Sequence, residues 1–392
     1  GRLVIAYQDE GNNDYGTAIV GTVDVDNNSI SFGTEVVFES ATTNWIAVTY
    51  DANAEKVVIS YQDAGNSNYG TAIVGTVSGT SISFGSPTVF ESATTDRIHS
   101  VYDSNAQKVV IFYQDRGNSN YGTAIVGTVS GTSISFGSAT VFESANTSEF
   151  SGAFDSSNNK VVIAYKDLGN SSYGTAVVGT VSGTSISFGT PVVFESANTE
   201  YTATAFDSEN NKIVIAYRDA GNSNKGTYIV GTVSGTSISF GTADYFENAD
   251  SDHIGLGYDA NAKKLVIAYG DVGNSDAYTV NNGTLSGTTV TWGTPQLVTG
   301  ATSGRGQLSS VVYASDVKRI TVAYRNNAVS GVGSAYVYRN SNVETNLTST
   351  NFIGFSDAAY SNGATAKIQI EGSVDDAQTG LTTAKVHYVQ ND

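Results

Sequence analysis

Short apolar or alternating runs, separated by polar turns, follow one another along most of the chain. Residues 45–90 contain four such runs, at 45–50, 56–62, 69–77 and 81–90. The runs are rich in β-branched and aromatic residues, and positions 81–84 alternate between Ser and an apolar residue, which is typical of β-strands. The segments between them supply the Asp, Asn and Gly that tight turns need. The pattern predicts four antiparallel strands, and no segment has a convincing helical period.

The four-strand pattern recurs along the chain. Its clearest marker is an apolar run that ends in Tyr-x-Asp, or once in Tyr-x-Asn. The marker tyrosines are Tyr7, Tyr61, Tyr113, Tyr165, Tyr217, Tyr269 and Tyr324. Most units therefore span ~52 residues, within the range of propeller repeats. Seven units of this kind predict an all-β fold, a seven-bladed β-propeller of four-stranded antiparallel blades. An open β-solenoid is the competing interpretation.

The two ends of the chain predict how the ring closes. Residues 3–8 form the second strand of a unit, so the first blade lacks an innermost strand of its own. Residues 355–360 fall where a first strand should come, and we expect them to complete that blade and remove its open edge. The predicted propeller covers 1–361. Residues 362–392 are a C-terminal β tail, either a degenerate further unit or the start of another domain.

Composition and charge exclude several functions. Lys and Arg number 19 against 37 Asp and Glu, and the net charge of −18 repels phosphate backbones, so no nucleic-acid partner is expected. The absence of Cys rules out disulfides, zinc-thiolate sites and thiol catalysis. No apolar run approaches the roughly 20 residues of a membrane helix, so we expect no membrane insertion.

The repeats are nearly identical over long stretches. Gly-Thr-Val-Ser-Gly-Thr-Ser-Ile-Ser-Phe-Gly occurs unchanged at 75–85, 127–137, 179–189 and 231–241. The sequence of 56–67, Lys-Val-Val-Ile-Ser-Tyr-Gln-Asp-Ala-Gly-Asn-Ser, followed by 69–77, resembles β-propeller repeat proteins of marine bacteriophages, a largely uncharacterised, tail- or fibre-associated family. The resemblance covers most of residues 1–300. It implies a virion-associated or surface-binding protein with a virion or extracellular location.

One repeat position varies while its surroundings stay constant. The first strand of each unit is rich in Gly, Ala, Ser and Thr. At its start, five units carry Trp45, Arg97, Glu149, Tyr201 and His253. In a propeller this position lies near the mouth of the axial channel. The set offers aromatic platforms, a bidentate donor and an acceptor, which suit a carbohydrate or protein ligand. Free drift of an exposed position after duplication is the alternative interpretation.

Two further positions vary between units. The residues that follow the marker Tyr are Gln8, Gln62, Gln114, Lys166, Arg218, Gly270 and Arg325. The residues that follow the marker Asp are Glu10, Ala64, Arg116, Leu168, Ala220 and Val272. We interpret both positions as loop surface.

The Asp-x-Gly-Asn loops place several oxygen atoms close together. Copies begin at Asp9, Asp63, Asp115, Asp167, Asp219 and Asp271. A calcium loop normally offers several carboxylates, whereas most of these loops have one Asp with Asn and Ser, which suffices for a side-chain-to-backbone turn. The turn is the favoured interpretation; calcium is the alternative, and no other cofactor is expected. The loops also look like the Asp-boxes of sialidase-like propellers, but Asn68 stands where the closing Trp is expected.

No catalytic constellation emerges from the sequence. Glu39, Glu91, Glu143 and Glu195 are copies of one Phe-Glu-Ser-Ala framework position and are interpreted as structural. The three histidines, His99, His253 and His387, lie in unrelated contexts, which gives no support to a Ser-His-Asp set or a His-rich metal site. Trp292 replaces a framework Phe and is interpreted as core.

These patterns predict a non-enzymatic module of a virion, structural or host-surface and glycan-binding, in a phage tail or fibre. Its expected partners are a cell-surface glycan or protein, or other virion proteins, and oligomer formation stays open. Several weak sites on a rigid ring would add by effective concentration. A secreted bacterial propeller lectin is the second interpretation, and a sialidase-like glycoside hydrolase is the third.

Overall fold

The computed structural model describes residues 1–298, 306–326 and 332–340, and the residue pairs 355–356 and 368–369. By contacts, the chain divides into a unit Gly1–Asn340 and a unit Ser341–Asp392. In the second unit, β28 (Phe355–Ser356) pairs antiparallel with β29 (Ile368–Gln369). The rest of the predicted closing segment 355–360, and nearly all of the tail 362–392, lies outside the described residues. Closure by that segment and the boundary at 361 therefore stay predictions.

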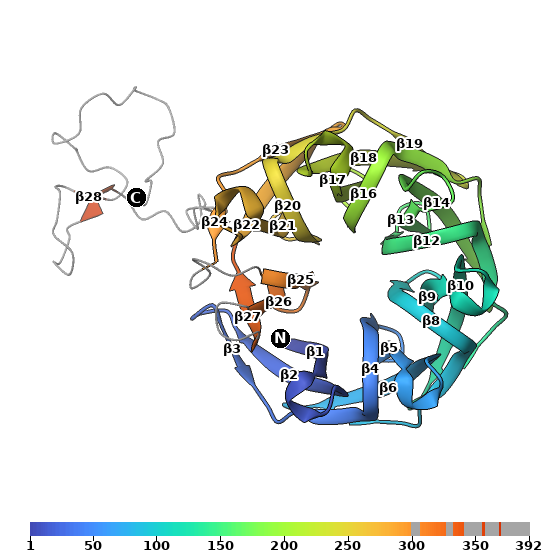
Figure 1. The fold of residues 1–392 in the computed structure, drawn as a ribbon. Coiled ribbons are helices and arrows are strands. Elements are labelled where there is room, and N and C mark those ends of the chain that lie inside the picture. The colour runs from blue at the N-terminus through green and yellow to red at the C-terminus, as the bar shows by residue number, and fades with distance from the viewer. Residues whose placement is uncertain (299–305, 327–331, 341–354, 357–367, 370–392) are drawn as a thin grey trace. The chain divides into compact units, whose positions relative to one another are not determined.

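Long strands link successive repeats of the first unit (Figure 1). Residues 36–42 of β4 pair with β2, whereas residues 43–51 of the same strand pair with β5. Each long strand thus begins on the outside of one group of strands and ends as the innermost strand of the next. The long strands are β4 (Val36–Asp51), β8 (Thr88–Asp103), β12 (Thr140–Asp155), β16 (Val192–Asp207) and β20 (Asp244–Asp259).

Shorter strands complete each group. The prediction of one strand over 81–90 is wrong, because 81–84 form a short outer strand and the residues from Thr88 on begin β8. The second strands, which end in the marker Tyr-x-Asp or Tyr-x-Asn, are β1 (Arg2–Asp9), β5 (Lys56–Asp63), β9 (Lys108–Asp115), β13 (Lys160–Asp167), β17 (Lys212–Asp219), β21 (Lys264–Asp271) and β26 (Arg319–Asn326). The third strands are β2 (Tyr15–Asp24), β6 (Tyr69–Ser78), β10 (Tyr121–Ser130), β14 (Tyr173–Ser182), β18 (Lys225–Ser234), β22 (Ala277–Ser286) and β27 (Val332–Tyr338). The short outer strands are β3 (Ser29–Phe32), β7 (Ser81–Phe84), β11 (Ser133–Phe136), β15 (Ser185–Phe188), β19 (Ser237–Phe240), β23 (Thr289–Trp292) and β24 (Gln296–Leu297). β25 (Gly306–Ala314) is the innermost strand beside β26.

Helical structure among the described residues is limited to single 3-10 turns after the second strands. These turns are η1 (Glu10–Asn12), η2 (Ala64–Asn66), η3 (Arg116–Asn118), η4 (Ala220–Asn222) and η5 (Val272–Asn274). None of the helices in this part of the chain is long and apolar enough to cross a membrane. The predicted all-β class is confirmed.

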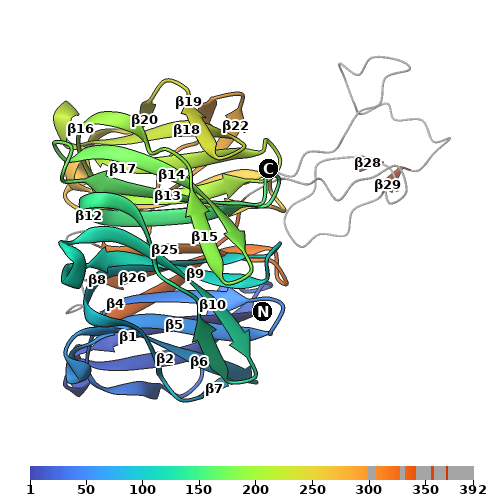
Figure 2. The same ribbon diagram turned by 90° about the vertical axis from the view of Figure 1, so that its right-hand side faces the viewer.

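The groups of strands follow one another around a central axis, as the blades of a β-propeller do (Figure 1). Seen from the side, their strands run mostly along that axis (Figure 2). Hydrogen bonds join β1 to β24 into one 24-stranded sheet, and β25 to β27 form a three-stranded sheet. The first and last described groups are in contact, because Glu10 lies 3.3 Å from Arg325 and the Gly1 amino group 3.7 Å from Asp316. A ring of this kind differs from the linear stack of a solenoid.

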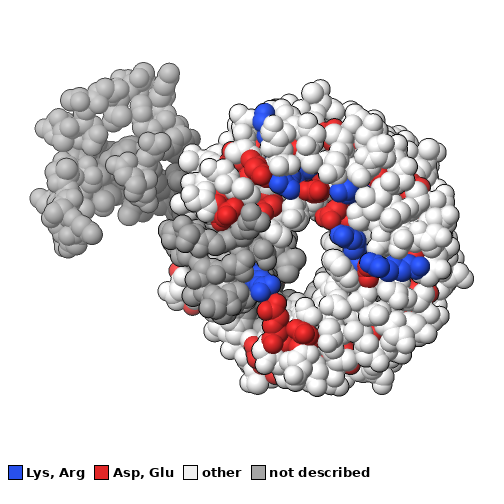
Figure 3. All heavy atoms as spheres, viewed as in Figure 1, with Lys and Arg blue, Asp and Glu red and all other residues white. Residues whose placement is uncertain are grey.

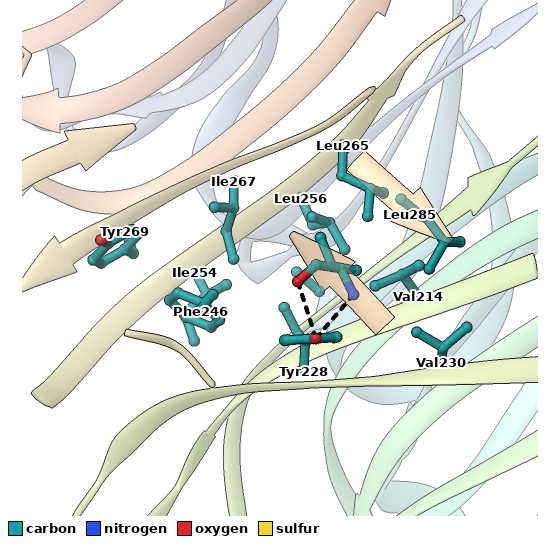
Figure 4. Close-up of a cluster of buried hydrophobic side chains, with 14 residues drawn as sticks. Val214, Tyr228, Val230, Phe246, Ile254, Leu256, Leu265, Ile267, Tyr269 and Leu285 are labelled. Atoms are coloured by element: carbon teal, nitrogen blue, oxygen red, sulfur yellow. Dashed lines mark hydrogen bonds between the residues drawn. The ribbon is translucent and has the colours of Figure 1, made fainter. Parts of the chain in front are cut away.

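The hydrophobic core lies between neighbouring groups. In one cluster, Val58 and Phe90 of one group pack against Ile111 and Tyr113 of the next, and all four are almost fully buried. Another cluster surrounds Tyr228 (Figure 4). There the Val290 amide donates to the Tyr228 hydroxyl oxygen at 3.0 Å. Trp292 packs against this cluster, in edge contact with Tyr228 at 5.6 Å between ring centroids, so its predicted core position is confirmed.

Each marker tyrosine from the second to the sixth repeat forms a hydrogen bond with the preceding group. The Tyr113 hydroxyl donates to Glu91 Oε2 at 3.0 Å, and the Tyr165 hydroxyl donates to Glu143 at 2.9 Å. Tyr61 with Glu39, Tyr217 with Glu195 and Tyr269 with Glu247 form the same pair. The repeated glutamates therefore bind neighbouring groups together, in agreement with their interpretation as structural residues.

Candidate functional site

The five residues of the variable position share one backbone feature. In β4, Asn44 pairs with Gln62 and Ala47 with Ser60, so Trp45 and Ile46 together face only Tyr61 and form a β-bulge. The same shift occurs in β8, β12, β16 and β20. At each bulge φ is positive: 51° at Trp45, 52° at Arg97, 55° at Glu149, 50° at Tyr201 and 47° at His253. Glycine takes this conformation most easily, yet every described copy carries a large side chain.

The five residues form a chain of contacts, here called the mouth belt. The Arg97 guanidinium carbon lies 5.1 Å from the centroid of the Trp45 ring, and its Nη1 lies 2.8 Å from Glu149 Oε1. Glu149 Oε2 accepts a hydrogen bond from the Tyr201 amide at 3.2 Å. The rings of Tyr201 and His253 are 4.8 Å apart between centroids. Residues that are 52 positions apart in sequence thus touch from one group to the next.

One end of the mouth belt is hollowed. A depression of about 150 Å³ is lined by Trp45, Arg97, Ile98, Glu149 and Phe150. Trp45 is 44% exposed, and the side chains of Arg97 and Glu149 are 35% and 24% exposed. The depression therefore offers an accessible aromatic face beside a guanidinium and a carboxylate.

The interpretation of the residues after the marker Tyr as loop surface is wrong, because every copy lies within a second strand and is buried or half-buried. Gln62 and Gln114 are 5% and 6% exposed, because their side chains point into the contact with the next group. Gln62 Nε2 donates to the Thr95 carbonyl at 2.7 Å and to Asp96 Oδ1 at 2.6 Å. These bonds hold the chain immediately before Arg97. Together with Lys166 and Arg218, these glutamines are called the support residues.

The charged support residues are paired with carboxylates. Arg218 Nε donates to Asp250 Oδ1 at 2.9 Å, and its Nη1 donates to Glu200 Oε2 at 2.7 Å. Lys166 lies 3.7 Å from Glu200. Burial lowers the pKa of Arg218, but the hydrogen bonds and charges of these two carboxylates outweigh burial and raise it. On the face drawn in Figure 3, basic and acidic residues alternate around the central opening.

The position after the marker Asp is exposed or half-buried in every described copy, as expected for a loop. Leu168 is 39% exposed. Arg116 forms an ion pair with Asp96, the residue before Arg97. One copy of this position therefore contacts the residue that precedes a member of the mouth belt.

The Asp-x-Gly-Asn loops use their aspartates as turn caps. Asp63 Oδ1 accepts a hydrogen bond from the Asn66 amide at 3.1 Å, and Asp115 does the same with Asn118 at 3.1 Å. Burial raises the pKa of Asp115. Within the described ranges, no three His, Asp or Glu residues are grouped so that they could hold a metal ion. The turn geometry accounts for these loops, and calcium binding stays a prediction.

His99 lies two residues beyond Arg97 and points into the packing. Its ring stacks on Phe112 at 5.1 Å, and its Nδ1 is buried without a hydrogen-bond partner. Burial lowers the pKa of this imidazole to about 4, so that it is neutral at pH 7. His99 therefore packs beside the candidate site as an uncharged ring.

The support residues were missed because the copies of this position were compared with one another but not with the residues opposite them on the neighbouring strand. Glu200 and Arg218, which pair directly across β16 and β17, carry opposite charges, and the neighbouring repeat places Ser148 opposite Lys166. Correlated changes at positions 18 residues apart were the available signal.

Comparisons with known proteins establish the fold. No protein-family model and no curated protein matches the sequence. The structure is similar to the BP39L lectin from Burkholderia pseudomallei, with TM-score 0.61 and 11% identity over 86% of this chain and 95% of the lectin. It is also similar to the periplasmic gluconolactonase PpgL of Pseudomonas aeruginosa, with TM-score 0.60 and 11% identity over 86% of this chain and 94% of that protein. A protein of unknown function from Dyadobacter fermentans matches with TM-score 0.53 and 11% identity over 76% of this chain and 95% of that chain. Because a lectin and an enzyme share the fold, the fold alone does not choose between binding and catalysis.

Proposed function

We propose that the chain is a non-enzymatic, carbohydrate-binding β-propeller of seven blades whose ligand lies on the mouth belt. Seven second strands, from β1 to β26, support the blade count. The contact of Glu10 with Arg325 supports a closed ring. The likeness to a lectin supports carbohydrate as the ligand class, since a lectin is by definition a carbohydrate-binding protein.

The observation that carries the proposal is the retained backbone strain at the mouth belt. A left-handed φ costs a residue with a side chain about 1–2 kcal/mol, and glycine would avoid most of this cost. The chain has 42 glycines, yet none occupies the bulge position in β4, β8, β12, β16 or β20. Strain that persists in five copies with five different large side chains is better explained by what the side chains bind than by free drift.

The same geometry favours binding over catalysis. Glycoside hydrolysis normally needs two carboxyl groups free to act as acid and as base or nucleophile. Beside the mouth belt, Glu149 is paired with Arg97, Asp96 with Arg116, and Glu200 with Arg218. Hydrolysis of gluconolactone or of a fluorogenic sialoside by the purified protein would overturn this part of the proposal.

A virion or extracellular setting is the further part of the proposal, with a phage tail or fibre as the favoured context. It rests on the resemblance of the repeat sequence to marine bacteriophage proteins. A cell-surface glycan or protein, or another virion protein, would then be the partner. Detection of the chain by mass spectrometry in purified virions of the source phage would support this setting, and its absence from them would contradict it.

A glycan-array screen tests the carbohydrate proposal. We expect the wild-type protein to bind, with and without calcium, and the Trp45→Ala/Tyr201→Ala double variant to lose binding. Tyr50→Ala is the matched control, because Tyr50 is a 56% exposed aromatic residue near the C-terminal end of β4 and is not part of the mouth belt. Equal binding by the double variant would place the site elsewhere. No binding by the wild type would favour a structural role.

A further inference from the structure

The mouth belt is one continuous surface rather than a set of equal sites. Each of its five members contacts the next, from Trp45 through Arg97, Glu149 and Tyr201 to His253. The five residues are all of different types. The depression of about 150 Å³ is lined by residues from Trp45 to Phe150 and does not include Tyr201 or His253. A single sugar in that depression would leave the Tyr201 and His253 end unused. A ligand that explains all five side chains must extend across several groups of strands.

The chemistry changes along the belt. Trp45 presents an exposed aromatic face at one end, and the Tyr201 and His253 rings contact each other at the other end. Aromatic faces pack against the apolar faces of sugar rings, and an ion pair such as Arg97 with Glu149 offers donors and acceptors to hydroxyl groups. The order of platform, polar centre and platform fits successive sugar units.

The charge of this region selects against acidic ligands. Among the described residues of the belt and its surroundings, the cations Arg97, Arg116, Lys166 and Arg218 are each within ion-pair distance of a carboxylate. An acidic sugar would have to displace Glu149 from Arg97 at a cost in desolvation and lost pairing. The net charge of −18 adds a general repulsion of anions.

We infer that the mouth belt binds one neutral oligosaccharide of several units, laid along it from the Trp45 depression to Tyr201 and His253. This inference rests on the proposed carbohydrate function of the same site. It specifies a single extended ligand per chain, in contrast to a separate sugar on each repeat.

Chain length is the first test. Isothermal titration with neutral gluco-, manno- and galacto-oligosaccharides of one to six units should show affinity rising about tenfold or more between one and four units, at one ligand per chain. Trp45→Ala and Tyr201→Ala should each weaken binding of the four-unit ligand about tenfold. Tyr50→Ala, outside the mouth belt, should leave the binding of both the monosaccharide and the four-unit ligand unchanged. Thermal unfolding of each variant checks that it is folded, and Trp45→Phe should keep most of the affinity.

Charge is the second test. The wild type should bind neutral oligosaccharides more tightly than the same sugars carrying uronic or sialic acid units. Glu149→Gln leaves Arg97 without its carboxylate and should shift the preference toward the acidic ligands by about tenfold. Glu209→Gln is the control, since it removes the same charge from a 51% exposed side chain in the turn between β16 and β17.

The outcomes separate the inference from the function on which it rests. If none of these carbohydrates binds, neutral or acidic, the proposed function fails and the inference with it. Binding of several monosaccharides per chain, with no gain from chain length, would overturn the inference while leaving a carbohydrate-binding protein. A wild-type preference for acidic sugars would do the same.

Discussion

Gly85 and Thr132 belong to neighbouring groups of strands, and the Thr132 carbonyl oxygen occupies the space that a β-carbon on Gly85 would need. The same approach joins Gly33 to Thr80, Gly137 to Thr184 and Gly189 to Thr236. A backbone carbonyl has little freedom to move aside. The glycine at these four positions is therefore required for adjacent groups to pack together.

Gly85→Ala should lower the free energy of unfolding by about 1–3 kcal/mol, because the added methyl group forces the two groups apart. Urea unfolding followed by tryptophan fluorescence measures the change. Gly79→Ala is the matched control: its φ of 60° is unfavourable for Ala, but nothing lies within 4 Å. That variant should lose only about 1 kcal/mol. Equal losses in the two variants would show that contact with Thr132 is not the cause.

Replacing a mouth-belt residue by glycine should separate stability from binding. Trp45→Gly removes the side chain and relieves the positive φ, whereas Trp45→Ala removes the side chain and keeps the strain. We expect the glycine variant to be more stable than the alanine variant by up to about 1 kcal/mol, with carbohydrate binding weakened in both. Chemical denaturation and the glycan array provide the two measurements. A glycine variant less stable than the alanine variant would contradict the assigned strain.

The repeated glutamates predict stabilisation on mild acidification. Burial, followed by the charge of Asp115, raises the pKa of Glu91, and burial also raises those of Glu39, Glu143 and Glu195. The folded state then binds more protons than the unfolded state between the usual pKa near 4.5 and the raised value. The contribution of these glutamates to the free energy of unfolding is fully present below pH 4.5. It is lost as the pH rises through their raised pKa. Urea titrations from pH 4.5 to 8 should give a smaller slope for Glu91→Gln than for the wild type, and equal slopes would refute the shift.

His99 predicts the opposite dependence on pH. Burial lowers its pKa from 6.5 to about 4, so the unfolded state takes up a proton that the folded state resists. Its contribution to stability is present above pH 6.5 and is lost as the pH falls toward 4. The variant His99→Phe keeps a ring beside Phe112 and cannot titrate. Between pH 7 and 5 it should lose less stability than the wild type when urea midpoints are compared, and an equal loss would show that the imidazole is not buried in neutral form.

The repeat made most of the fold predictable. Tyr61 and its copies mark the ends of the second strands, and the alternation at 81–84 marks a short outer strand, because both signals depend only on local side-chain periodicity. The variable position was also visible, since Trp45 and its counterparts stand out against a constant sequence. Its bulge and positive φ were not, because Gly or Asn is the usual sign of a left-handed residue and neither occurs there.

The sequence alone determined the all-β class, the second and third strands of a repeat and the five positions of the mouth belt. It did not show that the run 81–90 is divided, with its last residues beginning the long strand β8. Only the tertiary structure decided that these five residues contact one another in series and that Gln62 and Gln114 are buried. Gln62 reaches Asp96 across the contact between two groups, 34 residues along the chain. Such a pairing depends on how one group of strands packs on the next. Local periodicity sets the direction of a side chain within its own strand, but it carries no information about which neighbour that side chain meets.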